Sequence, residues 1–375
     1  MSTHDRPSRR EDFQIAIICA LPLEYDAVSL LFDEFWDEDG EPYGRAPGDT
    51  NSYVTGRMGK HDVVLALLPN MGKVSAAGTA SGLRSSYPSL KLAFLVGVCG
   101  AVPTISAYEV LLGDVIVSNT LMQYDFGRQY PSKFVPKGTI RDGLGRPNKD
   151  IRSLIAPFET EHGRERLQAR AAQHLEDLQK TATDKRRRCD YHYPGPAHDR
   201  LFAATYHHKH RGQPPCESCD TELESFCNTA AKASCEELIC DESQLVSRQR
   251  LVAKRNLESQ KVQRPEVFIG RIASGDTVMK SGEHRDQIAA QLEVIAFEME
   301  GAGAWDEIPC LIVKGVCDYA DSHKNKEWQP FAAATAAATM KAVLERYALT
   351  RPGSGGSGEC PGRRSPGGKP FWKPQ

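Results

Sequence analysis

Three acidic residues in the C-terminal half of the chain stand directly after short apolar runs. Glu298 and Glu300 close one such run in the sequence F-E-M-E-G, and Asp318 follows the next run, Leu311 to Val316. Glycines interrupt both segments, which favours a pocket over a solid core. Carboxyl groups at a pocket can hold a polar ligand on one side and deliver a proton on the other. The spacing therefore predicts a site of acid–base chemistry.

The elements that must position these residues alternate between strands and helices. Nearly continuous apolar runs predict buried strands at residues 13–21, 63–68, 92–98, 113–118, 267–273, 294–297 and 310–316. Helical spacing or a small, alanine-rich composition predicts helices at residues 23–35, 72–84, 282–292 and 330–347. This alternation indicates an α/β domain.

The alternating pattern breaks between residues 128 and 264, where the chain is charged, contains proline and lacks long apolar runs. Neither flank holds a complete alternating set, so we expect residues 128–264 to be an insertion within one domain that spans residues 13–348. One or two amphipathic helices are expected at residues 154–180. Residues 1–12 are expected to form a disordered leader, and the Gly-, Pro- and Ser-rich residues 349–375 a disordered tail.

Composition and motifs exclude several classes of function. The 375 residues carry a formal net charge of −2, which gives no reason to expect nucleic acid or a membrane as partner. The first apolar run is interrupted by Pro22 and Glu24, too early to span a bilayer. No G-x-x-x-x-G-K-[ST] sequence is present, which excludes a P-loop NTPase. Several of the eleven cysteines lie in apolar runs, as expected of reduced thiols in a soluble, cytoplasmic protein.

A second group of chemically active residues lies within the insertion. Cys216 and Cys219 form a C-x-x-C sequence, with three histidines, among them His210, just upstream. Further cysteines lie on either side: Cys189, Cys227 and Cys235. Two thiolates, one histidine and one more thiolate would complete a tetrahedral zinc site. A matching second pair is missing, so unligated cysteines in a flexible insertion are the alternative, and no catalytic metal or other cofactor is expected.

Five segments, taken in order, resemble the nucleoside phosphorylase and nucleosidase superfamily, especially the nucleosidases that act on methylthioadenosine and S-adenosylhomocysteine. They are I-A-I-I-C-A-L-P-L-E (15–24), N-M-G-K-V-S-A-A (70–77), L-V-G-V-C-G-A-V (95–102), S-G-D (274–276), and F-E-M-E-G with V-C-D-Y-A-D. The insertion and the sequence C-D-Y-A-D-S-H-K-N-K look most like fungal phosphorylase-like domains. The resemblance implies a phosphorylase/hydrolase-like three-layer α/β fold, with a central mixed sheet flanked by helices and a long insertion.

The resemblance also implies cleavage of the N-glycosidic bond of a purine, adenine-type nucleoside or nucleotide such as ATP. Asp318 occupies the place of the aspartate that protonates the leaving base at N7. Glu300 matches the glutamate that grips the ribose hydroxyls, Met299 would lie against the sugar, and Glu24 matches the glutamate that activates water. The other residues expected to contribute to substrate binding are Glu298, Cys99, Gly100, Ser274 and Asp276.

Departures from the family pattern leave alternatives open. Phosphorylases of this kind seat phosphate with an arginine and a serine, and this chain has Leu95 and Val98 in the corresponding loop. Water is therefore favoured over phosphate as the nucleophile, although Arg57 and Arg128 could still bind an anion. A phosphate-dependent phosphorylase and a non-catalytic nucleoside sensor are the alternatives. A homodimer is the assembly that the resemblance implies.

The plainer interpretation of the same residues is structural. Asp318 could cap the following turn, and Glu24 could be a solvated acid in the first turn of a helix. Glu298 could bind a backbone amide or a neighbouring chain. Cys317 stands where the nucleosidases commonly have serine, which puts the orientation of Asp318 in doubt. Residues 72–75 could bind an anion at a helix start or could pack closely on the sheet.

Overall fold

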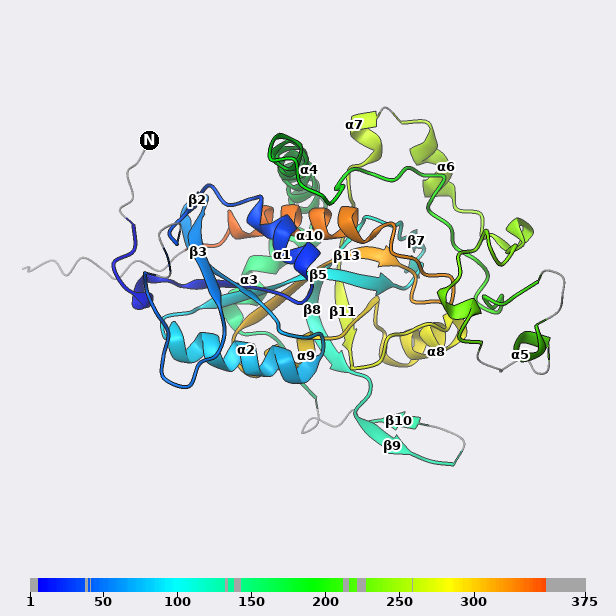
Figure 1. The fold of residues 1–375 in the computed structure, drawn as a ribbon, viewed down its shortest axis with the longest axis horizontal. Coiled ribbons are helices and arrows are strands. Elements are labelled where there is room, and N and C mark those ends of the chain that lie inside the picture. Colours follow the sequence, from blue (N-terminus) through cyan, green and yellow to red (C-terminus); the bar gives the residue numbers. More distant parts are fainter. Residues whose placement is uncertain are drawn as a thin grey trace, which may run out of the picture.

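The computed structural model describes residues 6–37, 40, 42–131, 134–137, 143–211, 216–220, 227–257 and 259–348. This part of the chain forms an α/β domain around a nine-stranded mixed sheet, in the order β12-β11-β8-β13-β5-β1-β4-β3-β2 (Figure 1). The predicted tail at 349–375 and the first five residues of the predicted leader lie outside the described residues.

The strands of the main sheet are β1 (Ile15–Cys19), β2 (Glu34–Phe35), β3 (Tyr53–Met58), β4 (His61–Leu67), β5 (Leu92–Ala101), β8 (Val115–Gln123), β11 (Val267–Ser274), β12 (Ala296–Glu298) and β13 (Cys310–Asp318). Two small hairpins pair β6 (Thr104–Ile105) with β7 (Tyr108–Glu109), and β9 (Gly127–Gln129) with β10 (Phe134–Pro136).

The helices are α1 (Pro22–Ser29), α2 (Lys73–Ser86), α3 (Lys149–Ile155), α4 (Glu161–Asp184), α5 (Glu217–Asp220), α6 (Gln249–Arg255), α7 (Ser259–Val262), α8 (Gly282–Leu292), α9 (Gly301–Ala304) and α10 (Gln329–Leu344). Short 3-10 helices cover Arg10–Asp12, Ala156–Glu159, Ala230–Lys232 and Glu242–Gln244.

Five strands of the sheet close on themselves. β12 pairs with β11 at one edge and also, in antiparallel register, with β5, where Ala296 faces Ala101 and Phe297 faces Gly100. β12, β11, β8, β13 and β5 therefore form a ring. Asp318 at the end of β13 lies opposite Gly100 of β5. The closure brings together the strand ends that carry the predicted acidic residues.

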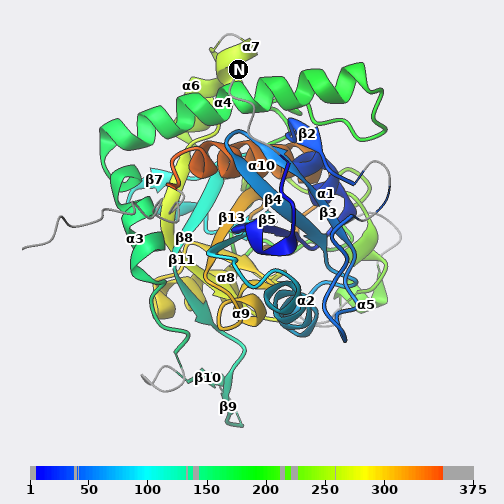
Figure 2. The same ribbon diagram turned by 90° about the vertical axis from the view of Figure 1, so that its left-hand side faces the viewer.

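Helices cover both faces of the sheet, which confirms the three-layer fold. Helices α1 and α10 lie on one face, and α2, α8 and α9 lie on the other (Figures 1 and 2). The long helix α4 lies across the outer side of α10, so residues 331–344 of α10 are buried all round. Among the described residues, no helix combines the length and apolarity needed to cross a bilayer.

Two predicted elements differ from the structure at one edge of the sheet. The predicted helix at 23–35 ends at Ser29, because Glu34 and Phe35 pair with β3 as a short strand. β3 itself was not predicted, since Thr55, Gly56 and Arg57 interrupt its apolar pattern. Gly56 is required there, because a Cβ would lie 2.6 Å from the ring of Phe32.

The ends of the predicted insertion and leader also differ. Leu167, Ala171 and Leu175 of α4 are buried in the main core, so this helix belongs to the domain that it was expected to interrupt. Residues 6–12, expected to be disordered, include the 3-10 helix Arg10–Asp12, and the guanidinium of Arg6 lies over the rings of Trp36 and Tyr43. Both departures arise because contacts distant in sequence hold polar-looking segments against the domain.

Gly315→Ala should destabilise the domain, because a Cβ at this position of β13 would collide with the carbonyl oxygen of Ala332 in α10. We expect the free energy of unfolding to fall by about 1–3 kcal/mol, measured by urea titration. Gly78→Ala in α2 is the matched control, since a Cβ there meets nothing within 4 Å. It should instead stabilise by about 0.5–1 kcal/mol. Equal effects of the two changes would contradict close packing of α10 on β13.

Candidate active site

Asp318 ends β13 as a buried carboxylate that is 7% exposed. Its Oδ1 accepts a hydrogen bond from the backbone N–H of Ala320 at 2.8 Å, and its Oδ2 lies 3.2 Å from the Nζ of Lys324. A Cβ at Gly100 would lie 2.7 Å from Oδ1, so glycine lets β5 approach this carboxylate. The backbone of the next turn holds one oxygen and leaves the other facing a cation.

The thiol of Cys317 also contacts Asp318. Its Sγ lies 3.4 Å from Oδ2 of Asp318 and 3.5 Å from the carbonyl oxygen of Cys99. Burial raises the pKa of Cys99, and the carboxylates of Asp318 and Glu298 raise it further. The Ala320 amide, the Cys317 thiol and the Nζ of Lys324 therefore all contact the carboxylate of Asp318.

Glu24 lies in the first turn of α1 and is buried, not solvated as the structural interpretation would require. Its Oε2 accepts hydrogen bonds from the backbone N–H groups of Ala20 and Leu21, each at 2.9 Å. Its Oε1 accepts one from Val98 on β5 at 2.8 Å. Burial raises the pKa of Glu24. Of its four acceptor positions three are used, which leaves Oε1 able to accept one more hydrogen bond.

Glu298 positions the turn that carries Glu300. Its carboxylate accepts hydrogen bonds from the backbone N–H of Glu300 at 3.1 Å and of Gly301 at 2.9 Å. Burial raises the pKa of Glu298. The hydroxyl oxygen of the neighbouring Ser274 accepts a hydrogen bond from the N–H of Ala302 at 2.9 Å. Glu298 and Ser274 thus hold backbone amides at the start of α9.

Lys314 joins the glutamates into one buried network. It lies in the middle of β13, 1% exposed, with its Nζ 3.0 Å from Oε2 of Glu300 and 3.8 Å from Oε2 of Glu298. Although burial disfavours the ammonium, the carboxylates of Glu300, Glu24 and Glu298 raise the pKa of Lys314. One cation therefore faces three carboxylates, which are excluded from water.

Sequence reasoning missed both lysines of the site. Lys314 interrupts the otherwise apolar run C-L-I-V-K-G-V, and a charge in a strand buried on both faces was a signal that it needs buried partners. Lys324 carried no such signal, because it lies in a charged loop after β13. Only the turn at Ala320, with a φ of 52°, brings it back toward Asp318.

Other predicted residues lie apart from this network or bind other groups. Asp276 is half exposed, and its Oδ1 accepts a hydrogen bond from the backbone N–H of Lys73 at 3.0 Å, at the start of α2. The Nζ of Lys73 lies 2.6 Å from Oδ2 of Asp125. Carboxylates of this chain therefore occupy the expected anion site at residues 72–75. Met299 is half-buried between Glu298 and Glu300.

A cavity of about 260 Å³ lies beside Asp318, between the loop after β13 and the insertion. Arg200, His323 and Lys324 are among its lining residues, whereas Glu24 and Glu300 are not. Two larger hollows, of about 760 and 700 Å³, lie along α4 and are lined by none of the candidate residues. The cavity at Asp318 thus adjoins a predicted site residue.

The predicted zinc ligands His210, Cys216 and Cys219 do lie together, and Cys227 is the fourth member of their group. A second group of four, not predicted, contains His208, Cys235, Cys240 and His323. His323 lies five residues after Asp318, so this second group connects the insertion to the loop of the candidate site.

Comparisons with known proteins agree with this architecture. Residues 14–186 match the phosphorylase superfamily. A nucleotide-binding leucine-rich repeat (NLR)-like protein of Hyaloscypha variabilis is 27% identical over 354 residues. That match covers 92% of this chain and 31% of the relative, so the chain spans about a third of the relative's length.

Among solved structures, the S-adenosylhomocysteine nucleosidase of Streptococcus pyogenes matches with a TM-score of 0.52 and 17% identity, covering 90% of this chain and 98% of that one. The 5'-methylthioadenosine/S-adenosyl homocysteine nucleosidase of Helicobacter pylori matches at 0.49 and 15%, covering 89% and 98%. The likeness to the Streptococcus pyogenes protein shows that the two share a fold.

Lys314→Met should remove the cation from the buried network and cost about 3–5 kcal/mol of unfolding free energy at neutral pH. The loss should be smaller at pH 5 than at pH 8. Without Lys314 the folded-state pKa values of Glu24 and Glu298 rise further, whereas unfolded glutamates ionise above about pH 4.3. At pH 5, but not at pH 8, Glu24 and Glu298 of the folded variant can therefore take up protons, which reduces the repulsion between the buried carboxylates. Urea unfolding at both pH values measures this difference.

Lys341→Met is the control for Lys314→Met. Lys341 is another buried lysine, but its single carboxylate partner, Asp33, is about half exposed at a distance of 3.0 Å. Its loss should differ less between pH 5 and pH 8 than the loss of Lys314, because it affects one neighbouring titrating group, His174, whose pKa it lowers. A loss in Lys314→Met that depends on pH no more than the loss in Lys341→Met would contradict the shared network.

Proposed function

Because residues 14–186 match the phosphorylase superfamily, we propose that the chain belongs to it and cleaves the N-glycosidic bond of a purine nucleoside or nucleotide, with water as the acceptor. The observation that carries the proposal is the convergence of buried carboxylates at the strand ends joined by the β12–β5 pairing. We assign Asp318 to protonate the leaving base, Glu300 to bind the sugar and Glu24 to activate the water.

Asp318 is the proposed general acid. A departing purine accumulates negative charge, which a proton at N7 removes. Because the Ala320 amide occupies Oδ1, the proton is delivered from Oδ2. The entering base must displace Lys324 from this oxygen. The electron pair of the glycosidic bond then leaves with the protonated base.

Glu300 is proposed to bind the ribose hydroxyls and to stabilise the positive charge that develops on the sugar. Two hydroxyls can donate to one carboxylate, and Lys314 holds Glu300 in place with its Nζ 3.0 Å from Oε2. Lys314 faces three carboxylates, so the network carries net negative charge. This charge can stabilise the cationic, oxocarbenium-like transition state. Met299, next to Glu300 in the chain, is proposed to contact the sugar.

Glu24 is the proposed general base. The unused acceptor position of its Oε1 can take a proton from water, whose oxygen then bonds to the anomeric carbon. The net reaction adds one water and releases the free base with ribose from a nucleoside or ribose phosphate from a nucleotide. Three fixed backbone amides hold the carboxylate in place and leave one direction for the water.

Water is favoured over phosphate because the cations that could bind an anion are paired with carboxylates or lie away from the site. Lys73 binds Asp125, and Arg57 binds Asp62 at 3.1 Å on β3, toward the opposite edge of the sheet from β12. Arg128 lies on the β9–β10 hairpin, which extends from the domain (Figure 1). We include nucleotides such as ATP among the candidate substrates because Arg200 and Lys324 line the cavity beside Asp318.

Product chromatography tests the proposal. Adenosine, methylthioadenosine, inosine, AMP and ATP are incubated with the protein, with and without phosphate. We expect free base without phosphate from at least one of them, and a fall in kcat of about 10²- to 10⁴-fold in Asp318→Asn. Asp306→Asn, at an exposed position, is the control and should keep full activity.

Each other outcome of this experiment contradicts a different part of the proposal. Base released only with phosphate would make the protein a phosphorylase. No base from any substrate, together with a nucleoside-dependent rise in Tm, would make the domain a binding module.

The pH dependence of kcat/KM should report Glu24. A general base must be ionised, and burial raises the pKa of Glu24. Activity should therefore fall with decreasing pH through a value above that of an ordinary glutamate, about 4.3. Glu24→Gln should lower kcat and remove this acidic limb. Return of full activity after transfer from low pH to pH 7 controls for acid unfolding, and an unchanged limb in Glu24→Gln would reject Glu24 as the base.

A further inference from the structure

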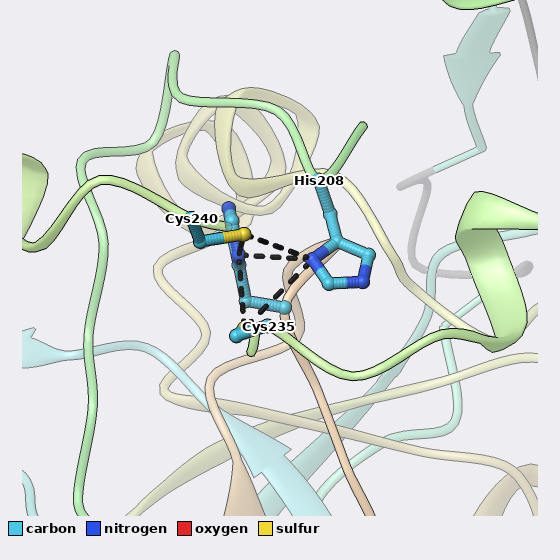
Figure 3. A group of neighbouring side chains, drawn as sticks. His208, Cys235 and Cys240 are labelled. Carbon is cyan, nitrogen blue, oxygen red and sulfur yellow. Dashed lines mark hydrogen bonds between the residues drawn. The ribbon is translucent and has the colours of Figure 1, made fainter. Parts of the chain in front are cut away.

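Four side chains converge where the insertion meets the loop after β13. Figure 3 shows His208, Cys235 and Cys240 directed toward one another, and His323 is the fourth member of this inner cluster. The Nδ1 atoms of the two histidines lie 3.3 Å apart. Sγ of Cys235 lies 3.8 Å and 3.6 Å from the Nδ1 atoms of His208 and His323, and Sγ of Cys240 lies 3.6 Å and 3.8 Å from them.

These distances fit a tetrahedral zinc ion. With Zn–N bonds of about 2.0–2.1 Å and Zn–S bonds of about 2.3 Å, ideal tetrahedral angles put two nitrogens about 3.3 Å apart and a nitrogen and sulfur about 3.6 Å apart. A Cys2His2 set is a usual ligand set for structural zinc. From this geometry we propose that the chain binds zinc at the inner cluster, and that this ion ties the insertion to the loop that carries Asp318.

Hydrogen bonds on the far side of both imidazoles support the proposal. The Nε2 of His208 donates to the carbonyl oxygen of Ala233 at 3.0 Å, and the Nε2 of His323 donates to that of Tyr206 at 2.7 Å. Each neutral ring then has its proton on Nε2 and a lone pair on Nδ1. Two lone pairs facing each other at 3.3 Å repel unless a cation or a proton lies between them.

A second group, the outer cluster, contains His210, Cys216, Cys219 and Cys227. Nδ1 of His210 lies 3.3 Å from Sγ of Cys219 and 3.7 Å from Sγ of Cys227, which lies 3.9 Å from Sγ of Cys216. The described cysteines form no disulfide. A Cys3His set is also a usual structural zinc site, so we assign a second ion here.

The part of the insertion around both clusters has little else to stabilise it. Among the described residues, its separate apolar core contains five buried ones: Phe202, Cys219, Ala230, Leu238 and Cys240. Two of the five are cluster cysteines. Its described regular structure is the four-residue α5 and two 3-10 helices of three residues each. Small units with so little core are commonly held by a metal or by disulfides.

The inner ion is structural, because protein ligands fill all four positions and leave none for water. Its effect on the site comes through the chain. His323 supplies a ligand, the hydroxyl oxygen of Ser322 accepts a hydrogen bond from the N–H of His208 at 3.1 Å, and the next residue, Lys324, binds Asp318. Zinc at the inner cluster therefore fixes the turn between Asp318 and Lys324. This second step rests on the proposed function of Asp318.

Metal content measured by inductively coupled plasma mass spectrometry tests the sites without reference to activity. We expect two zinc ions per purified chain, one in Cys240→Ser and one in Cys219→Ser. Cys189→Ser, a half-buried cysteine outside both clusters, should keep two. Wild-type protein without zinc that also fails to take up added Zn²⁺ or Co²⁺ would overturn the proposal. Cobalt bound without the absorption bands of tetrahedral thiolate coordination would overturn it as well.

The link to Asp318 is tested by hydrogen exchange over residues 318–324, with and without zinc, and by base release. Removing the inner ion by Cys240→Ser should increase exchange there at least tenfold and lower base release at least tenfold. Cys189→Ser should change neither quantity. Unchanged exchange in Cys240→Ser, with one ion lost, would leave the metal sites standing and overturn the link. If the wild type releases no base, the exchange measurement alone decides the link, so the two proposals fail separately.

Discussion

The buried ammonium of Lys314 is the interaction on which the candidate site depends. A lysine in the middle of a strand buried on both faces is tolerated only with buried carboxylates, and Glu24, Glu298 and Glu300 supply them from α1, β12 and the start of α9. Conversely, three carboxylates excluded from water need a cation among them. The charges thus fix the relative positions of elements that lie almost 300 residues apart in sequence.

The close approach of carboxylates to the backbone of β5 is the second constraint on the site. The ring of five strands closes through the β12–β5 pairing, and glycine stands where a neighbouring carboxylate comes close. A Cβ at Gly97 would collide with the carboxylate of Glu24, and one at Gly100 would crowd Asp318. Gly97 and Gly100 therefore let the carboxylates of Glu24 on α1 and Asp318 on β13 pack against β5.

The sequence predicted what short-range patterns encode. β5, β13, α8 and α10 were located to within a few residues. Glu300 and Asp318 were selected as candidates from their positions after apolar runs, and Glu24 from the family resemblance. β3 was missed because its burial depends on a partner strand. α4 was expected as an amphipathic helix but was assigned to the insertion, because its packing in the main core depends on α10, far away in sequence. His208 and His323 lie 115 residues apart, and no local pattern joins them. Their pairing is a property of the folded chain.

The insertion shows how a poorly cored segment can still influence the site. Its apolar cluster is too small to hold its own shape, so its position must be set by specific contacts with the domain. Several of these contacts fall on the loop between β13 and α10: His208 reaches Ser322 and His323, and the ring of Phe202 stacks on His323 at 4.1 Å. The same loop begins with Asp318 and includes the Lys324 that binds it. Contacts that order the insertion therefore also order Asp318, the residue proposed to protonate the base. A change in the conformation of the insertion should alter the position of Asp318, and the reverse should hold as well.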